Sequence, residues 1–175
     1  MERVAVVGCG GAGKSTFASA LGDRAGLPVI HLDEHFWHPG WVETPRDEWI
    51  EVQRRLVDGE RWVIDGNYGG TLDVRFERAD TIVVLALPRT TCVAGVLRRV
   101  ITRHGNEVQA AGCPERFDMT FVRWVWNYDR DSRPRVDAAL DRHRDSSTVI
   151  ELRSRREVAA FLDRVAPAGG VSPRS

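Results

Sequence analysis

The residues Gly8-Cys9-Gly10-Gly11-Ala12-Gly13-Lys14-Ser15 match the pattern G-x-x-x-x-G-K-[ST]. A short apolar run, 3–7, precedes the motif, and a stretch with helical periodicity follows it. The glycines let the backbone curl so that successive amide groups point inward and bind phosphate oxygens. The positive end of the following helix faces the same anion. The motif therefore predicts a P-loop that binds a nucleoside triphosphate.

Individual positions of this motif have distinct expected roles. We expect Lys14 to reach the β- and γ-phosphates, the Ser15 hydroxyl to coordinate Mg²⁺, and Thr16 to hydrogen-bond the α-phosphate. Lys14 is also the only lysine in the chain. A compact ammonium and a guanidinium are not interchangeable in a tight site, which favours a specific role for this lysine. The predicted nucleotide-binding residues are Gly8, Gly10, Gly11, Ala12, Gly13, Lys14, Ser15 and Thr16.

Hydrophobic periodicity and turn residues divide the chain into alternating strands and helices. The expected strands are 3–7, 28–32, 61–64, 81–87 and 148–152. The expected helices are 14–24, 45–57, 72–77, 90–103, 118–140 with a break at Pro134, and 154–165. This alternation predicts an α/β protein with a parallel sheet covered on both faces. Five strands, with a loop before the last long helix, fit a nucleoside-monophosphate-kinase-like P-loop fold with a lid.

Length and composition bound the organisation of the protein. The 175 residues suit one domain, 1–166, with 104–117 as a mobile lid and 167–175 as a disordered tail. No apolar run approaches the ~18 residues of a membrane span, and we expect no signal peptide. Three cysteines without paired spacing fit a reduced, cytoplasmic protein. A formal net charge of zero disfavours nucleic acid as a partner. A monomer and a homodimer both remain open.

The motif does not by itself say what happens to the triphosphate. A GTPase carries an N-K-x-D motif for guanine, and a chain whose only lysine is Lys14 has no such motif. The chain is also short for an ABC or AAA ATPase module. A small kinase is the class that fits best, with ATP or GTP as the phosphate donor, because P-loop contacts are to phosphates and do not distinguish the bases.

The acceptor side of the predicted kinase follows the second strand. Asp33 comes directly after that strand, and ligands of parallel α/β sheets bind beyond the carboxyl ends of the strands. Asp33 could therefore orient an acceptor hydroxyl and accept its proton. The alternatives are that Asp33 only caps a turn or that it holds a water molecule bound to Mg²⁺. Trp37 and Trp41 lie in a predicted loop and could form an aromatic wall that stacks on a ring-bearing acceptor. Core packing is the other interpretation of these tryptophans.

The third strand ends in a second polar group of residues, Asp65-Gly66-Asn67-Tyr68. Asp65 could hold water on Mg²⁺ or contact the acceptor, and Asn67 and Tyr68 offer hydrogen bonds and a ring face. An ordinary Asp-Gly turn remains the alternative.

Arginines surround the predicted lid. Arg99 and Arg103 are four residues apart on one helical face, and Arg116 and Arg123 follow in and after the loop. Arginines stabilise the charge that develops during phosphoryl transfer once a lid closes and excludes water. We expect Arg99 and Arg103 to be catalytic and Arg116 and Arg123 to bind the acceptor, although arginine is common in this chain and any one of them could be an ordinary surface residue.

Four segments carry a family resemblance: the P-loop, His31-Leu32-Asp33 with Trp37-x-Pro39-Gly40-Trp41, Arg61-Trp62-Val63-Ile64-Asp65-Gly66-Asn67-Tyr68, and Ile150-x-Leu152-Arg153-Ser154. As a set, over about 3–162, they resemble the bacterial FlaR-like proteins, labelled topology modulation proteins, which are relatives of adenylate kinase. Arg99 and Arg103 look like the paired arginines before the adenylate kinase lid. Asp65-Gly66-Asn67-Tyr68-Gly69 departs from the D-G-F-P-R segment of adenylate kinase, which weakens the case for AMP as acceptor.

An aspartate after the second strand is similar to that of small-metabolite kinases such as shikimate and gluconate kinase. Phosphotransferases that inactivate nucleoside antibiotics such as capuramycin also resemble this group, which implies a role in antibiotic resistance. The sequence thus predicts a Mg²⁺-dependent hydroxyl kinase for a nucleoside, sugar or nucleoside antibiotic. A nucleoside monophosphate kinase and a nucleotide-binding regulator linked to DNA are the two alternatives.

Overall fold

The apolar run before the P-loop forms β1 (Arg3–Gly8), the middle strand of a five-stranded parallel sheet. The sheet has the order β2-β5-β1-β6-β7 in this computed structural model, which describes residues 1–105 and 110–165. The other strands are β2 (Val29–His31), β5 (Trp62–Asp65), β6 (Thr81–Leu85) and β7 (Thr148–Leu152). The parallel α/β fold expected from the sequence is confirmed.

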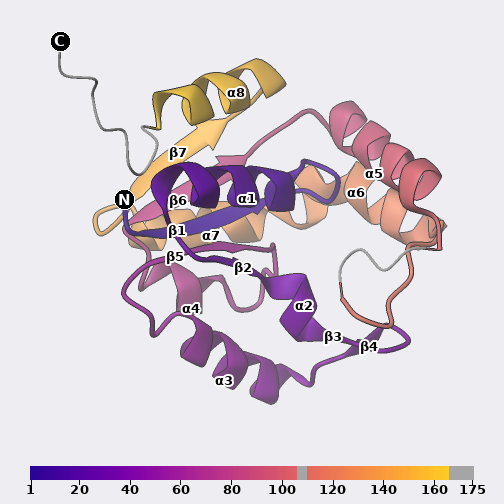
Figure 1. Cartoon of the computed structure of the whole chain (residues 1–175), viewed down its shortest axis with the longest axis horizontal. Helices are drawn as coiled ribbons and strands as arrows, with labels where there is room; N and C mark the ends of the chain where they lie inside the picture. The colour runs from indigo at the N-terminus through magenta and orange to yellow at the C-terminus, as the bar shows by residue number, and fades with distance from the viewer. Residues whose placement is uncertain (106–109, 166–175) are drawn as a thin grey trace, which may run out of the picture.

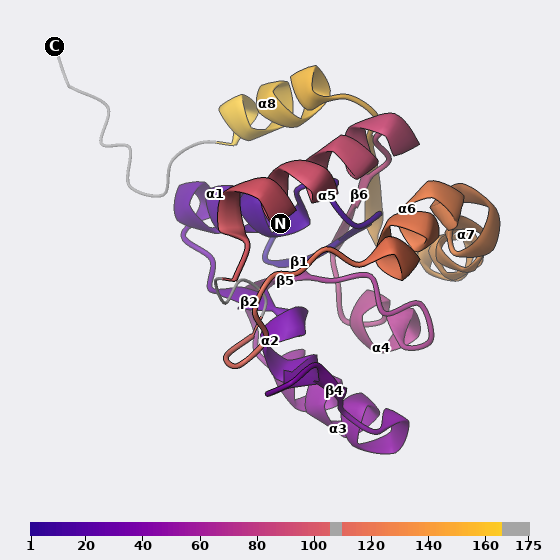
Figure 2. The same cartoon turned by 90° about the vertical axis from the view of Figure 1, so that its right-hand side faces the viewer.

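Helices cover both faces of the sheet, as Figures 1 and 2 show. On one face, the inward residues of the sheet pack against α1 (Lys14–Ala25), α5 (Arg89–Arg103), α6 (Met119–Asp131) and α8 (Arg155–Arg164). On the other face they pack against α3 (Arg46–Leu56), α4 (Leu72–Phe76) and α7 (Arg133–His143). The strands are apolar on both sides because both sides are buried.

The register of the sheet places the carboxyl ends of three strands together. His31 at the end of β2 pairs with Asp65 at the end of β5, and Asp65 pairs with Val6 of β1. The P-loop leaves β1 two residues after Val6, so the polar ends of β2 and β5 lie beside it. This juxtaposition follows from strand pairing and is not visible in the linear sequence.

The segment expected to be a loop after the second strand is instead ordered. Its first residues form the short helix α2 (Leu32–Phe36), and the antiparallel strands β3 (Trp37–His38) and β4 (Val42–Glu43) form a small hairpin. Trp37 therefore lies in a strand, and the expectation that it lies in a loop was wrong. Trp41 lies in the hairpin turn with a φ of 65°. We refer to residues 37–43 as the aromatic hairpin.

The long helical stretch predicted over 118–140 is two helices. The break falls at Ser132, where α6 ends and α7 begins, and Pro134 occupies the first turn of α7. Proline fits a first helical turn because no backbone N–H is required there. The Asp118 side chain caps α6 by accepting hydrogen bonds from the backbone N–H groups of Thr120 and Phe121. The predicted break is confirmed. The predicted tail, 167–175, lies outside the described residues.

Candidate functional site

The P-loop connects the end of β1 to the start of α1. Gly11 and Gly13 have φ values of 75° and 91°, in the left-handed region that favours glycine. Gly13 is the residue before α1, so the loop ends at a helix N-terminus, which is suited to bind an anion. The loop also packs closely on α5, since a Cβ atom at Gly11 would lie 2.1 Å from the Cys92 carbonyl oxygen. The structure therefore forms the P-loop that the motif predicts.

Lys14 is the first residue of α1 and folds back across the loop. Its Nζ donates a hydrogen bond to the Cys9 carbonyl oxygen at 3.1 Å. The same carbonyl accepts a hydrogen bond from the Ala12 backbone N–H at 3.3 Å. The ammonium is thus held at the phosphate-binding loop, where the sequence placed it. The carbonyl is a neutral acceptor, and an anionic phosphate oxygen in its place would add an ion pair to the hydrogen bond.

The Ser15 hydroxyl donates a hydrogen bond to Asp65 Oδ2 at 2.8 Å. Asp65 is 4% exposed and comes from β5, so two distant segments supply adjacent oxygen atoms. Mg²⁺ prefers oxygen ligands, keeps several waters, and is held in kinase sites through few protein groups plus substrate phosphates. The Ser15 hydroxyl and the Asp65 carboxylate fit such an ion. No cluster of three His, Cys, Asp or Glu side chains arranged to hold a metal occurs within 1–105 and 110–165.

His31 completes the polar network around Asp65. Its Nδ1 forms a short hydrogen bond with Asp65 Oδ1, while its Nε2 lies 3.5 Å from the Ser19 hydroxyl of α1. The hydrogen bond with Asp65 raises the pKa of His31, and burial opposes this effect. The sequence prediction gave His31 no chemical role and used it only as part of the His31-Leu32-Asp33 segment that carries the family resemblance.

Asp33 lies in α2, directly beyond the end of β2. Its Oδ1 accepts a hydrogen bond from the Tyr68 hydroxyl at 2.5 Å. Burial and the neighbouring Asp33 raise the pKa of Tyr68, so this hydroxyl stays protonated and acts as a donor. The structure thus brings together two predicted acceptor residues, one from the second strand region and one from the third.

A buried arginine, Arg75, holds the loop that carries Tyr68. Arg75 is 1% exposed and donates hydrogen bonds to Gln53 Oε1 at 3.1 Å and to the Asn67 carbonyl oxygen at 3.3 Å. Burial lowers the pKa of Arg75 to about 10, which leaves it protonated at neutral pH. On the other side, the Tyr128 hydroxyl donates to Asn67 Oδ1 at 3.0 Å. Asn67 therefore fixes the position of the loop by accepting hydrogen bonds at both its backbone carbonyl and its side-chain oxygen.

Aromatic rings surround the Asp33–Tyr68 pair. The Phe36 ring centroid lies 4.9 Å from that of Trp37, 5.0 Å from that of Trp49 and 4.7 Å from that of Tyr68. Trp37 in turn contacts Trp41 at 5.4 Å. The indole N–H groups of Trp41 and Trp49 are buried, and each has no hydrogen-bond partner among the described residues. The rings thus form one cluster beside Tyr68, and the wall that stacks on an acceptor stays a prediction.

The predicted lid arginines differ in their surroundings. Arg99 Nε lies 2.7 Å from Glu115 Oε2 in an ion pair that lacks the alignment of a hydrogen bond. Arg116 lies over the Trp41 ring, 5.8 Å from its centroid. Arg103 and Arg123 are exposed on α5 and α6. Arg116 thus contacts a predicted acceptor residue, and Arg99 contacts a residue of the predicted lid. Among the described residues, no such contact is seen for Arg103 or Arg123.

Part of the predicted lid, 110–117, contacts the aromatic hairpin. The Gly40 backbone N–H donates to the Gly112 carbonyl oxygen at 2.9 Å, and the Cys113 thiol donates to the His38 carbonyl oxygen at 3.2 Å. These bonds join the segment after α5 to the segment after β2. The remainder of the lid prediction includes 106–109, which are outside the described residues.

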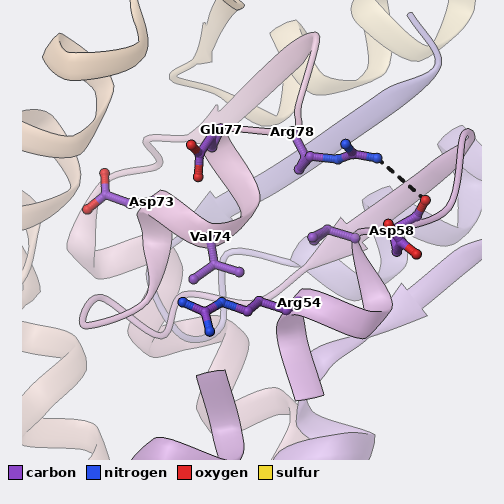
Figure 3. A pocket seen from close by; sticks show the side chains of 7 residues that line it. Arg54, Asp58, Asp73, Val74, Glu77 and Arg78 are labelled. Atoms are coloured by element: carbon purple, nitrogen blue, oxygen red, sulfur yellow. Dashed lines mark hydrogen bonds between the residues drawn. The ribbon is translucent and has the colours of Figure 1, made fainter. Parts of the chain in front are cut away.

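Two of the cavities among the described residues bear on where the site lies. The smaller one, of about 220 Å³, adjoins the P-loop, and its lining includes Gly8, Cys9, Tyr128 and Arg153. The larger one, of about 300 Å³, lies between α3 and α4 (Figure 3), and no P-loop residue lines it. It is lined by Arg54, Val57, Asp58, Asp73, Val74, Glu77 and Arg78. None of these residues belongs to the P-loop or to the polar network around Asp65, so we place the functional site at the P-loop and not in the larger cavity.

Four residues near the site were not predicted from the sequence: His31, Arg75, Glu115 and Tyr128. Each acts through a partner from another element, and only the three-dimensional pairing identifies that partner. His31 offered the strongest available signal, since it ends a strand next to Asp33.

Among the helices of the described chain, none has the length and apolar composition to cross a membrane.

Solved structures share this architecture at low sequence identity. A shikimate kinase from Acinetobacter baumannii in complex with shikimate is 15% identical, with a TM-score of 0.57 over 94% of this chain and 90% of the other. A gluconokinase from Sinorhizobium meliloti is 18% identical, with a TM-score of 0.54 over 94% and 93%. A sugar kinase from Janibacter sp. has 17% identity and a TM-score of 0.51 over 94% and 91%. These likenesses establish a P-loop kinase-like fold.

Sequence comparison adds a relative at higher identity. The chain matches no protein-family model. It is 30% identical over 149 residues to the uncharacterized protein YqaC of Bacillus subtilis, and the match covers 81% of each chain. The protein therefore belongs to the same family as YqaC.

Proposed function

We propose that the protein is a Mg²⁺-dependent phosphotransferase that moves the γ-phosphate of ATP or GTP to a hydroxyl of a small, ring-containing acceptor. The observation that carries this proposal is the contact between Ser15 Oγ and Asp65 Oδ2 at 2.8 Å. It joins the hydroxyl of the P-loop to a carboxylate from the neighbouring strand, next to Asp33. The proteins similar in fold are a sugar kinase, a gluconokinase and a shikimate kinase, which supports an alcohol as acceptor.

The proposed reaction assigns a role to each side of the site. The P-loop amides and Lys14 hold the β- and γ-phosphates, and Asp33 accepts the proton of the acceptor hydroxyl. The hydroxyl oxygen bonds to the γ-phosphorus while the bond from that phosphorus to the β-phosphate oxygen breaks, and the nucleoside diphosphate leaves. Mg²⁺, held by Ser15 and through water by Asp65, would neutralise charge on the phosphates. Arg99 and Arg103 are proposed to stabilise the transferring group.

The aromatic residues support a ring-containing acceptor. Trp37, Trp41 and Tyr68 offer ring faces on which a ring-bearing acceptor could stack. Asn67, Arg116 and Arg123 are further proposed acceptor contacts. The resemblance to FlaR-like proteins and to phosphotransferases of nucleoside antibiotics makes nucleosides and nucleoside antibiotics the first acceptors to test, followed by sugars.

The test is release of ADP or GDP in a coupled assay, with wild-type protein and Lys14→Ala and a panel of hydroxyl compounds. We expect wild-type turnover that requires Mg²⁺ and is nearly abolished in Lys14→Ala. Full activity of Lys14→Ala would contradict the proposal. Faster release with AMP, CMP or UMP than with neutral acceptors would identify a nucleoside monophosphate kinase instead.

A further inference from the structure

His31 lies in a closed polar network at the edge of the P-loop. Ser15 and Ser19 are four residues apart on α1 and therefore share one face of that helix. The Ser15 hydroxyl donates to Asp65 Oδ2, and His31 contacts both Asp65 Oδ1 and the Ser19 hydroxyl. Each Asp65 oxygen thus has a separate partner, so the carboxylate is fixed in rotation.

The network determines how the imidazole is oriented. A carboxylate oxygen only accepts, so His31 must donate from Nδ1, and the neutral ring then accepts at Nε2 from the Ser19 hydroxyl. The bond at Nε2 is the weaker one, since its atoms are 3.5 Å apart. His31 and Asp65 are also direct neighbours in the β2–β5 register, which limits the movement of both residues.

We propose that His31 is a positioning residue for the metal–nucleotide site: it holds Asp65 so that Oδ2 faces the Ser15 hydroxyl. This inference rests on the proposed function, because Ser15 and Asp65 are the groups proposed to serve Mg²⁺. Partners that orient a metal-binding group change metal affinity when they are removed, typically 10- to 100-fold. The inference concerns the hydrogen bond from Nδ1, and it requires no contact between His31 and the substrate.

Three substitutions separate this role from a general effect on packing. His31→Leu removes the donor to Asp65. His31→Asn keeps an amide N–H near the position of Nδ1. Ser19→Ala removes only the weak contact at Nε2 and serves as the matched control. For each protein, the dissociation constant of ATP is measured by titration with and without saturating Mg²⁺.

We expect Mg²⁺ to tighten ATP binding by the wild-type protein, and we expect His31→Leu to lose roughly tenfold or more of that gain. His31→Asn and Ser19→Ala should keep most of it, and all four proteins should bind Mg²⁺-free ATP alike. An unchanged Mg²⁺ effect in His31→Leu would overturn the role of His31 and leave the proposed function standing. No Mg²⁺-dependent binding in the wild-type protein would overturn both.

A second measurement needs no variant and covers the case in which His31→Leu fails to fold. Nitrogen NMR of the wild-type imidazole reports which ring nitrogen carries the proton. The network requires a proton on His31 Nδ1. A ring protonated on Nε2 alone would overturn the inference, because such a ring has no donor facing Asp65.

Discussion

Arg99 and Glu115 form an ion pair with a separation of 2.7 Å, and the Glu115 side chain is only 4% exposed. The pair links the last turns of α5 to the segment that contacts the aromatic hairpin. The Gly105 backbone N–H also donates to the Glu115 carbonyl oxygen at 2.9 Å. Glu115 therefore anchors the described part of the predicted lid.

The first prediction concerns this anchor. Arg99→Ala leaves the Glu115 carboxylate buried without its cation, which destabilises a protein strongly. We expect a loss of up to about 3 kcal/mol in the free energy of unfolding, measured by urea denaturation. Arg103→Ala, at an exposed position of the same helix, is the control and should change stability by less than about 0.5 kcal/mol. Equal losses in both variants would show that the ion pair adds no stability.

A second prediction concerns the close approach of α5 to the P-loop. A Cβ atom at Gly95 would lie 2.2 Å from the Gly11 carbonyl oxygen. Replacing glycine by alanine inside a helix normally stabilises it by about 0.5–1 kcal/mol. We expect Gly95→Ala to destabilise the protein by about 1–3 kcal/mol, because the added methyl group overpacks the contact. It should also weaken nucleotide binding, since Gly11 is displaced.

The matched control is Gly59→Ala, where the nearest atom to an added Cβ lies 3.7 Å away. Its stability and its dissociation constant for ATP should both stay close to those of the wild-type protein. Wild-type behaviour of Gly95→Ala in both measurements would mean that α5 can move away from the P-loop at little cost.

A third prediction follows from Asp80, which joins the starts of β1 and β6. Its carboxylate accepts hydrogen bonds from the backbone N–H groups of Glu2 and Arg3, both at 2.8 Å, and from the Thr81 hydroxyl at 2.7 Å. Burial raises the pKa of Asp80, but these hydrogen bonds outweigh it and leave the pKa below its usual value. A depressed pKa means that the folded state favours the ionised carboxylate.

The stabilisation from Asp80 is therefore complete above about pH 4, the ordinary pKa of an aspartate, and is lost as pH falls through its lower folded value. At pH 7, we expect the free energy of unfolding of Asp80→Asn to be about 1–3 kcal/mol lower than that of the wild-type protein. Between pH 7 and pH 3, the free energy of unfolding should fall less in Asp80→Asn than in the wild-type protein. Unfolding curves over that range are the measurement. Parallel pH profiles for the two proteins would contradict the assignment.

Local sequence signals predicted the P-loop and the individual strands because each depends on neighbours in the chain. Glycines at fixed spacing before Lys14 encode the loop, and β-branched residues over 148–152 encode β7 at its observed bounds. The Ser154 side chain caps α8 by accepting a hydrogen bond from the Glu157 backbone N–H, and these two residues have the local spacing of a capping box. Each of these features is complete within a few residues, so no knowledge of distant segments was needed.

The rest of the candidate site depends on pairings between distant segments. The contact of Ser15 with Asp65 joins residues 50 positions apart, and that of Asp33 with Tyr68 joins residues 35 apart. The sequence suggested a function for each residue but not its partner. The aromatic hairpin was missed because its order depends on contacts beyond the local sequence. Trp37 packs on Phe36 and Trp41 packs on Trp37. The Gly40 backbone N–H and the His38 carbonyl oxygen bond to the segment 110–117.

The last prediction tests the proposed base. Asp33→Asn keeps the shape of the side chain and removes its ability to accept the acceptor proton. Loss of general-base catalysis typically lowers the rate ~10²–10⁴-fold, so kcat should fall by about that range while the dissociation constant of ATP changes little. Weaker binding of Mg²⁺·ATP would assign Asp33 to the metal instead.

The hydrogen bond to Asp33 provides the control for this test. Tyr68→Phe removes only the hydroxyl that Asp33 Oδ1 accepts from at 2.5 Å, so the carboxylate stays in place but loses one restraint. We expect a smaller fall in kcat for Tyr68→Phe than for Asp33→Asn, because the base remains present. If Asp33→Asn kept the wild-type kcat, Asp33 would be an ordinary residue of α2, and Asp65 would become the carboxylate to test as the base.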